Sequence, residues 1–179
     1  LISLIGIYSC EDKSSESAYD TIHEFELHPN NRVSSLLMSG NEYDEWVNND
    51  GFSNTSLRTG LVQDIYQRFD DNYDFIILLL NEPSIPEGLS YYGMLIGVSN
   101  NVEGIGLSSY DFSSEYGSSG KLKAIIQMTG LEYLKYGPAL HELAHQWANF
   151  ALPTHSVSST GTNLTSFLFG SHWGFTGGN

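Results

Sequence analysis

Hydrophobic and polar positions along this chain change spacing from segment to segment. Between Ser56 and Asp70 apolar residues recur every three or four positions behind polar residues that can cap a helix, so this pattern predicts a helix. Phe75–Leu80 is instead a continuous apolar run, which is typical of a strand buried on both faces. A helix followed directly by a buried strand indicates layers of helix packed on sheet.

The remaining segments have weaker patterns. Lys121–Met128 alternates partly and carries two lysines, so it is predicted as an edge strand. His23 and His28 match no compact metal motif and are interpreted as solvated surface residues. Residues 21–29 are predicted as a short strand or helical turn, and residues 41–54 as an irregular loop or short helix. Residues 91–98 are predicted as a strand, and residues 100–120 as a surface loop that lines a cleft.

A second helix is predicted from Pro138 to Leu152. Proline is tolerated in the first helical turn, where its missing N–H costs nothing, and Pro153 ends the pattern. Apolar residues at helical spacing in this segment indicate a helix that is largely buried.

His141, Glu142 and His145 form an H-E-x-x-H pattern within this helix. Positions four apart share a helix face, so both imidazoles can reach one metal ion. Glu142 lies about 100° further around the axis and can reach a water on that metal as a general base. The alternative is an amphipathic core helix whose histidines are spaced by coincidence.

Catalytic zinc usually takes a third protein ligand. No Asp or Glu follows Glu142, so the downstream candidates are His155 and His172. A helix that continues to Leu152 places the chain about 10 Å beyond His145 along the helix axis. The next three residues span at most about 3.5 Å each, so His155 can barely reach back to the metal ion. His172 has a long Ser-, Thr- and Gly-rich return path and is preferred. The remaining alternative is that the third ligand is lost or lies past Asn179.

Length and composition suit one globular domain, because 179 residues with 40% hydrophobic and 13% aromatic residues can bury a sizeable core. The net charge of −14 argues against nucleic acid or an anionic membrane surface as a partner. A single cysteine, Cys10, rules out an internal disulfide. The sequence does not determine the oligomeric state.

Residues 1–20 are interpreted as the end of a leader and a polar tether. The apolar run before Cys10 is similar to a bacterial lipoprotein signal, which predicts a lipid anchor at that cysteine. The alternative is a first strand, Ile2–Tyr8, and the run is too short for the roughly 20 residues of a membrane span. We expect residues 21–179 to form the catalytic domain, truncated at its C-terminal end.

The segment 121–174 resembles the zincin metallopeptidases, and among them secreted bacterial zincin-like proteins that pair H-E-x-x-H with a later His-Trp. The resemblance implies an α+β fold with a twisted mixed sheet, an edge strand, a backing helix and a metal-binding active-site helix. It implies Zn²⁺ on His141, His145 and His172, with Glu142 as the catalytic base. The chain departs from better-known subfamilies, because no glycine lies three residues after His145 and no glutamate follows.

From this resemblance we expect hydrolysis of a peptide or protein substrate that lies along the edge strand, outside the cytoplasm. Candidate stabilisers of the oxyanion are Tyr133, Tyr136 and His155. Two alternatives stay open. One is a catalytically inactive, metal-bearing surface module for binding or adhesion, and the other is a scaffold without metal.

Overall fold

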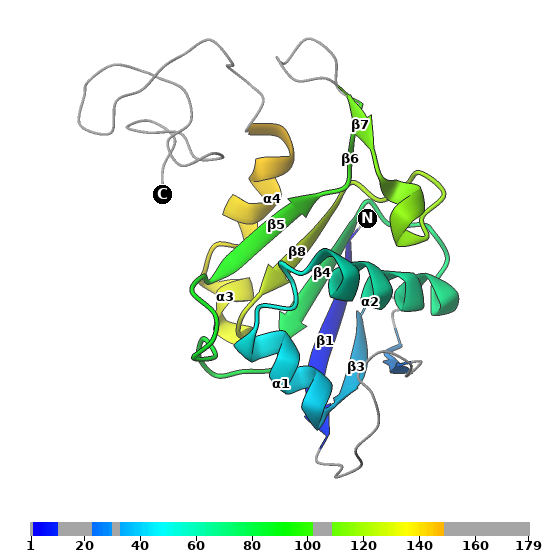
Figure 1. Cartoon of the computed structure of the whole chain (residues 1–179). Helices are drawn as coiled ribbons and strands as arrows, with labels where there is room; N and C mark the ends of the chain where they lie inside the picture. Colours follow the sequence, from blue (N-terminus) through cyan, green and yellow to red (C-terminus); the bar gives the residue numbers. More distant parts are fainter. Residues whose placement is uncertain (1, 11–22, 30–32, 102–108, 149–179) are drawn as a thin grey trace, which may run out of the picture.

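The computed structural model describes residues 2–10, 23–29, 33–101 and 109–148. They form a mixed α+β fold around a six-stranded sheet of order β2-β3-β1-β4-β8-β5, with helices on both faces (Figure 1). The strands of this sheet are β1 (Ile2–Cys10), β2 (Glu24–Leu27), β3 (Val33–Ser39), β4 (Phe75–Leu80), β5 (Gly93–Gly97) and β8 (Ala124–Met128). The four inner strands are parallel, and the edge strands β2 and β5 run antiparallel to their neighbours.

The other described elements are helices and one short strand pair. They are α1 (Gly40–Asn48), α2 (Thr55–Arg68), the 3-10 helix η1 (Ser113–Tyr116), α3 (Leu131–Lys135), α4 (Ala139–Ala148), and β6 (Ser99–Asn100) paired with β7 (Tyr110–Asp111). The helix predicted over residues 56–70 is confirmed as α2. Its N-terminus is capped by Asn54, whose side chain accepts the N–H groups of Ser56 and Leu57.

Strand β4 divides the core into two clusters, because all six of its side chains are buried. Ile76, Leu78 and Leu80 pack in the larger cluster with residues of α1 and α2. Ile77 and Leu79 face the other way, into the cluster that receives residues of α3 and α4. Burial on both faces is the outcome that the continuous apolar run predicts.

Residues 2–10 form a strand of the sheet interior, which corrects the interpretation of this stretch as the end of a leader. β1 pairs in parallel with β3 on one side and with β4 on the other. Ile5 is fully buried in the larger core cluster. The lipid anchor at Cys10 is tested by nothing in the structure and stays a prediction.

The predicted edge strand Lys121–Met128 is also corrected. β8 begins only at Ala124, lies between β4 and β5, and is buried at all five positions. Lys121 and Lys123 precede the strand, so their charges do not enter the sheet interior. The edge next to β8 is β5, within the segment predicted as a strand at residues 91–98.

A chain of buried and partly buried polar groups connects α1 to the segment before β5. The Nε1–H of Trp46 in α1 donates to Oε1 of Gln127 at 2.7 Å, and Nε2 of Gln127 donates to the hydroxyl of Tyr91 at 2.7 Å. The Tyr91 hydroxyl donates to Asp50 at 2.7 Å. Burial and the neighbouring Asp50 raise the pKa of Tyr91, so the phenol stays protonated and keeps donating.

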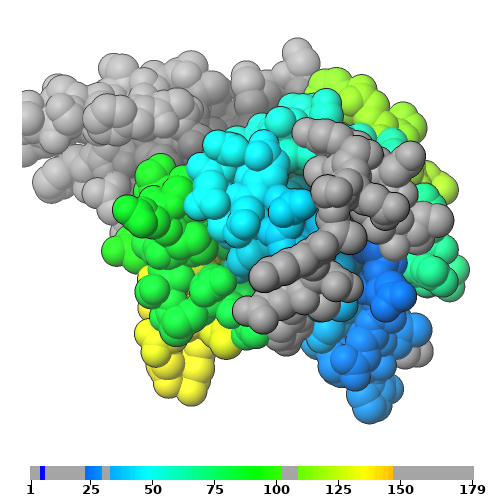
Figure 2. All heavy atoms as spheres, turned by 60° about the horizontal axis from the view of Figure 1, so that its bottom comes forward, coloured from blue at the N-terminus to red at the C-terminus, as the bar shows by residue number. Residues whose placement is uncertain are grey.

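Helix α1 packs against the segment that leads from β4 to β5. The Tyr43 hydroxyl donates to Glu82 at 2.6 Å, and a Cβ at Gly88 would lie 2.4 Å from the Val47 carbonyl oxygen. Figure 2 shows this contact from the end of the molecule at α1, with the cyan helix beside the green segment. Among the described residues, no helix has the length and apolar character needed to cross a bilayer.

Candidate metal centre

Helix α4 lies across β5 and β8 and presents three different faces. Leu143 packs into the smaller core cluster beside β8, whereas Leu140 is 81% exposed. Glu142 and Gln146, four residues apart, are both buried. The predicted helix is confirmed over residues 139–148, while its expected continuation to Leu152 lies outside the described residues.

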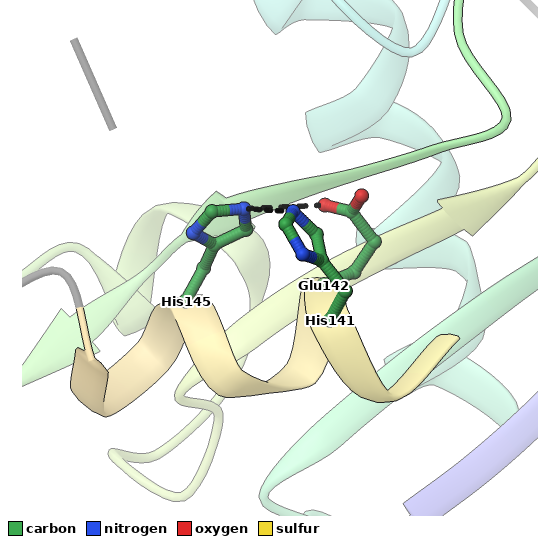
Figure 3. Close-up of side chains that lie close together, drawn as sticks. All are labelled: His141, Glu142 and His145. Atoms are coloured by element: carbon green, nitrogen blue, oxygen red, sulfur yellow. Dashed lines mark hydrogen bonds and ion pairs between the residues drawn. The ribbon is translucent and has the colours of Figure 1, made fainter. Parts of the chain in front are cut away.

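The two histidines of α4 bring their ring nitrogens together. Nε2 of His145 lies 3.1 Å from Nε2 of His141, and 4.0 Å from Oε2 of Glu142. One ligand atom from each of the three residues lies within 4.8 Å of the others. All three side chains rise from the same side of the helix (Figure 3).

This geometry fits a divalent transition-metal ion. Two nitrogens bound to one zinc ion at 2.0–2.1 Å and a tetrahedral angle are separated by about 3.3 Å, close to the observed 3.1 Å. Neutral imidazoles are preferred ligands of such ions. The group His141, Glu142 and His145 can therefore hold a metal ion, although its donor set does not define which one.

Glu142 is anchored beside the histidines rather than exposed to bulk water. Only 7% of the residue is exposed, and this burial raises the pKa of its carboxyl group. The neighbouring His145 and the backbone of Leu95 act in the opposite direction and lower the pKa of this carboxyl group. A carboxylate with a raised pKa accepts a proton more readily than an exposed carboxylate with the ordinary pKa.

Polar and steric contacts fix α4 against the edge strand. Nε2 of Gln146 donates to the Ser99 carbonyl at 3.0 Å, and Nδ2 of Asn100 donates to the Gln146 carbonyl at 3.4 Å. A Cβ at Gly93 would lie 2.9 Å from Cγ of Glu142, so glycine permits the close approach of helix and strand. Sequence reasoning missed Gly93 and Gln146, although the spacing of Gln146 from Glu142 places both on one helix face.

The other predicted site residues divide into two groups. His155 and His172 lie outside the described residues, so the third ligand stays a prediction. Tyr133 stacks edge-to-face on Tyr92, with ring centroids 4.9 Å apart, and Tyr136 is 76% exposed. No described contact joins either tyrosine hydroxyl to the three residues of the centre.

Comparisons with known proteins do not assign the chain to a family. No family model, curated protein or solved structure matches it.

Proposed function

We propose that the protein is a zinc-dependent peptidase in which a metal-activated water attacks the peptide bond. The observation that carries this proposal is the convergence of two imidazole nitrogens, 3.1 Å apart, with the carboxylate of Glu142 on one side of α4. The fold supports it through its arrangement of a backing helix, a mixed sheet with an antiparallel edge strand, and the helix of the metal centre.

Each residue of the centre has a separate role in this proposal. His141 and His145 bind the ion through Nε2, and His172 is the proposed third ligand, with His155 as the alternative. Bound zinc lowers the pKa of a coordinated water to about 7 and polarises a carbonyl group. Glu142 would accept a proton from the water that attacks the peptide carbonyl and would deliver it to the leaving amine.

The substrate in this proposal is a peptide or protein segment in extended conformation. β5 takes the role first expected of Lys121–Met128, because β5 is the sheet edge beside α4. An extended chain can add to such an edge through main-chain hydrogen bonds. Action outside the cytoplasm remains part of the proposal, and its support is the sequence resemblance alone.

The decisive variant is Glu142→Gln, which keeps the size of the side chain and removes the base. We expect it to retain zinc, measured by elemental analysis, and to lose at least about 100-fold in cleavage of a peptide library. The matched control is Glu132→Gln, an exposed position on α3 that should leave cleavage unchanged. Full activity of Glu142→Gln would refute the assignment of the base.

The same measurements separate the proposed peptidase from its alternatives. A wild-type protein that binds zinc but cleaves no peptide would favour the inactive binding module. Zinc affinities of His172→Ala and His155→Ala then identify the third ligand, because only loss of a ligand should weaken binding strongly.

A further inference from the structure

The side chains of β5 alternate between the two faces of the sheet. Leu95 packs in the smaller core cluster beside α4, whereas Met94 and Ile96 pack against the larger cluster on the other face. Gly93 and Gly97 stand two residues before and after Leu95, so both positions face α4. They lie about 13 Å apart along the strand, at about 3.3 Å per residue. The face of β5 beside α4 therefore has a position without a side chain at each end.

A different polar side chain approaches β5 at each of these glycines. A Cβ at Gly93 would lie 2.9 Å from Cγ of Glu142, the proposed base. A Cβ at Gly97 would lie 2.5 Å from the hydroxyl oxygen of Tyr110, which belongs to the strand pair beyond the end of β5 (Figure 1). The Tyr110 hydroxyl therefore lies on the same face of β5 as Glu142, at the opposite end of the strand.

Helix α4 carries its two histidines along the space between these side chains. Glu142, in the first half of α4, lies at the beginning of β5, and Gln146, one turn later, bonds to residues that follow β5. One of these is Asn100, which pairs with Tyr110 and donates to the Gln146 carbonyl at 3.4 Å. His145 immediately precedes Gln146, so it belongs to the turn of α4 nearest Tyr110. The base and the phenol thus approach the metal centre from opposite ends of β5.

The Tyr110 hydroxyl is an uncommitted hydrogen-bond donor. Within the part of the chain that the structure describes, no residue forms a hydrogen bond with it. The ring is held by the pairing of β6 with β7 and by Phe112, whose ring centroid lies 5.8 Å away. Burial raises the pKa of Tyr110, so the phenol keeps its proton at neutral pH.

We infer that Tyr110 stabilises the oxyanion that forms from the scissile carbonyl of a bound peptide. This inference rests on the proposed peptidase function. Tyr110 takes the role first considered for Tyr133 and Tyr136, neither of which has a described contact with the metal centre. A substrate strand along the β5 edge would present its carbonyl between the base and the phenol.

Tyr110 acts as a hydrogen-bond donor in this step and transfers no proton. The water oxygen bonds to the carbonyl carbon, the water proton passes to Glu142, and the π electron pair of the C=O bond moves to the carbonyl oxygen. The Tyr110 O–H donates to this negative oxygen. When the C–N bond breaks, the electron pair forms the C=O bond again and Glu142 delivers the proton to the leaving amine. A donor placed for the developing charge lowers the barrier without tightening substrate binding.

Tyr110→Phe tests this role, because it removes the hydroxyl and retains the ring. We expect kcat for a library peptide to fall about 100-fold with KM within about twofold, since the hydrogen bond forms only in the transition state. Zinc affinity should equal that of the wild type. The matched control is Tyr66→Phe, which removes a hydroxyl from α2 on the other face of the sheet and should leave all three values unchanged.

Binding of a transition-state analogue provides a measurement that does not depend on turnover. The probe is a phosphinate analogue of the library peptide that the wild type cleaves best, titrated into zinc-loaded protein. Tyr110→Phe should weaken its binding about 10- to 100-fold, the range for one hydrogen bond to a charged group. The uncleaved parent peptide, measured with Glu142→Gln, should bind equally with and without the Tyr110 hydroxyl.

Gly97→Ala tests the placement of the hydroxyl. The added Cβ would displace the Tyr110 hydroxyl, so phosphinate affinity should fall as it does in Tyr110→Phe. In the double variant the two losses should not add, because both remove the same hydrogen bond. Fully additive losses would contradict the inference.

The results distinguish this inference from the proposed function. Wild-type kcat or phosphinate affinity in Tyr110→Phe would overturn the role of Tyr110 in a protein that is still a peptidase. A fall in zinc affinity, or a loss confined to KM, would overturn it as well, because the hydroxyl would then support the metal site or substrate binding instead. Absence of zinc binding and cleavage in the wild type would overturn the proposed function, and this inference with it.

Discussion

The buried imidazole of His23, just before β2, contacts both α1 and α2. Its Nδ1 lies 2.7 Å from Oδ2 of Asp64 in α2, and its Nε2 lies 2.6 Å from Oε1 of Glu42 in α1. Ionised carboxylates only accept hydrogen bonds, so the ring donates at both nitrogens and is positively charged. Burial lowers the pKa of His23, but the two carboxylates outweigh this effect and raise it overall.

The raised pKa predicts that stability falls at alkaline pH. The contribution of His23 is complete below its unfolded-state pKa of about 6.5 and is lost as pH rises through the higher folded-state pKa. At about pH 6, we expect His23→Gln to lower the free energy of unfolding by about 2 kcal/mol, the scale of a hydrogen bond to a charged group. The difference from wild type should shrink toward pH 9.

Chemical denaturation at a series of pH values measures this difference. His28→Gln is the control, because His28 makes one described side-chain bond, to Ser35 at 2.9 Å, and that partner is neutral. At about pH 6, His28→Gln should lower the free energy of unfolding by less than His23→Gln does, because it removes one hydrogen bond to a neutral partner. A constant difference between wild type and His23→Gln from about pH 6 to pH 9 would contradict the charged imidazole.

The contrast between His23 and the pair on α4 shows which sites a sequence reveals. His141 and His145 are four residues apart, so helix geometry alone predicts that their rings meet. The partners of His23 are 19 and 41 residues away, and only tertiary packing brings them to the ring. Only 8% of His23 is exposed, so its interpretation as a solvated surface residue was wrong. The sequence could not show this, because the partners of His23 are distant along the chain.

At the scale of elements, the contact between α4 and β5 controls the geometry of the metal centre. We expect Gly93→Ala to push the helix from the strand, because its Cβ would lie 2.4 Å from Cε of Met128 and 2.9 Å from Cγ of Glu142. Such overpacking costs about 1–3 kcal/mol of stability. Zinc affinity should fall as well, since the histidines move with α4.

Gly60→Ala is the matched control for this substitution. Gly60 lies within α2, and an added Cβ there has no atom within 4 Å. Alanine should stabilise the helix by about 0.5–1 kcal/mol without affecting zinc affinity. Zinc titration and denaturation of both variants provide the comparison. A Gly93→Ala protein with wild-type zinc affinity would show that this contact does not position the centre.

The elements that the sequence predicts well are those with a local period. α2 and β4 follow from the spacing of apolar residues within each segment, and so does the described part of α4. The place of a strand within the sheet is a different property, because it depends on pairing between distant segments. β8 was therefore misplaced at an edge, and the run at residues 2–10 could be interpreted as a leader or as a strand.

At the scale of the whole molecule, the parallel inner strands form a rigid base that carries the antiparallel β5 beside α4. A metal ion that binds only the folded state should stabilise this arrangement by mass action. At free zinc about 100 times the dissociation constant, we expect the free energy of unfolding to rise by about 2.7 kcal/mol. The rise should disappear in His141→Ala.

Zinc content tests the central claim most directly. Elemental analysis of protein purified without chelator, followed by titration of the zinc-free form, should give one equivalent of zinc for wild type. His141→Ala and His145→Ala should bind it far more weakly, whereas His28→Ala should bind it as the wild type does. Wild-type protein without stoichiometric zinc, or zinc retained in full by both α4 variants, would contradict the metal centre.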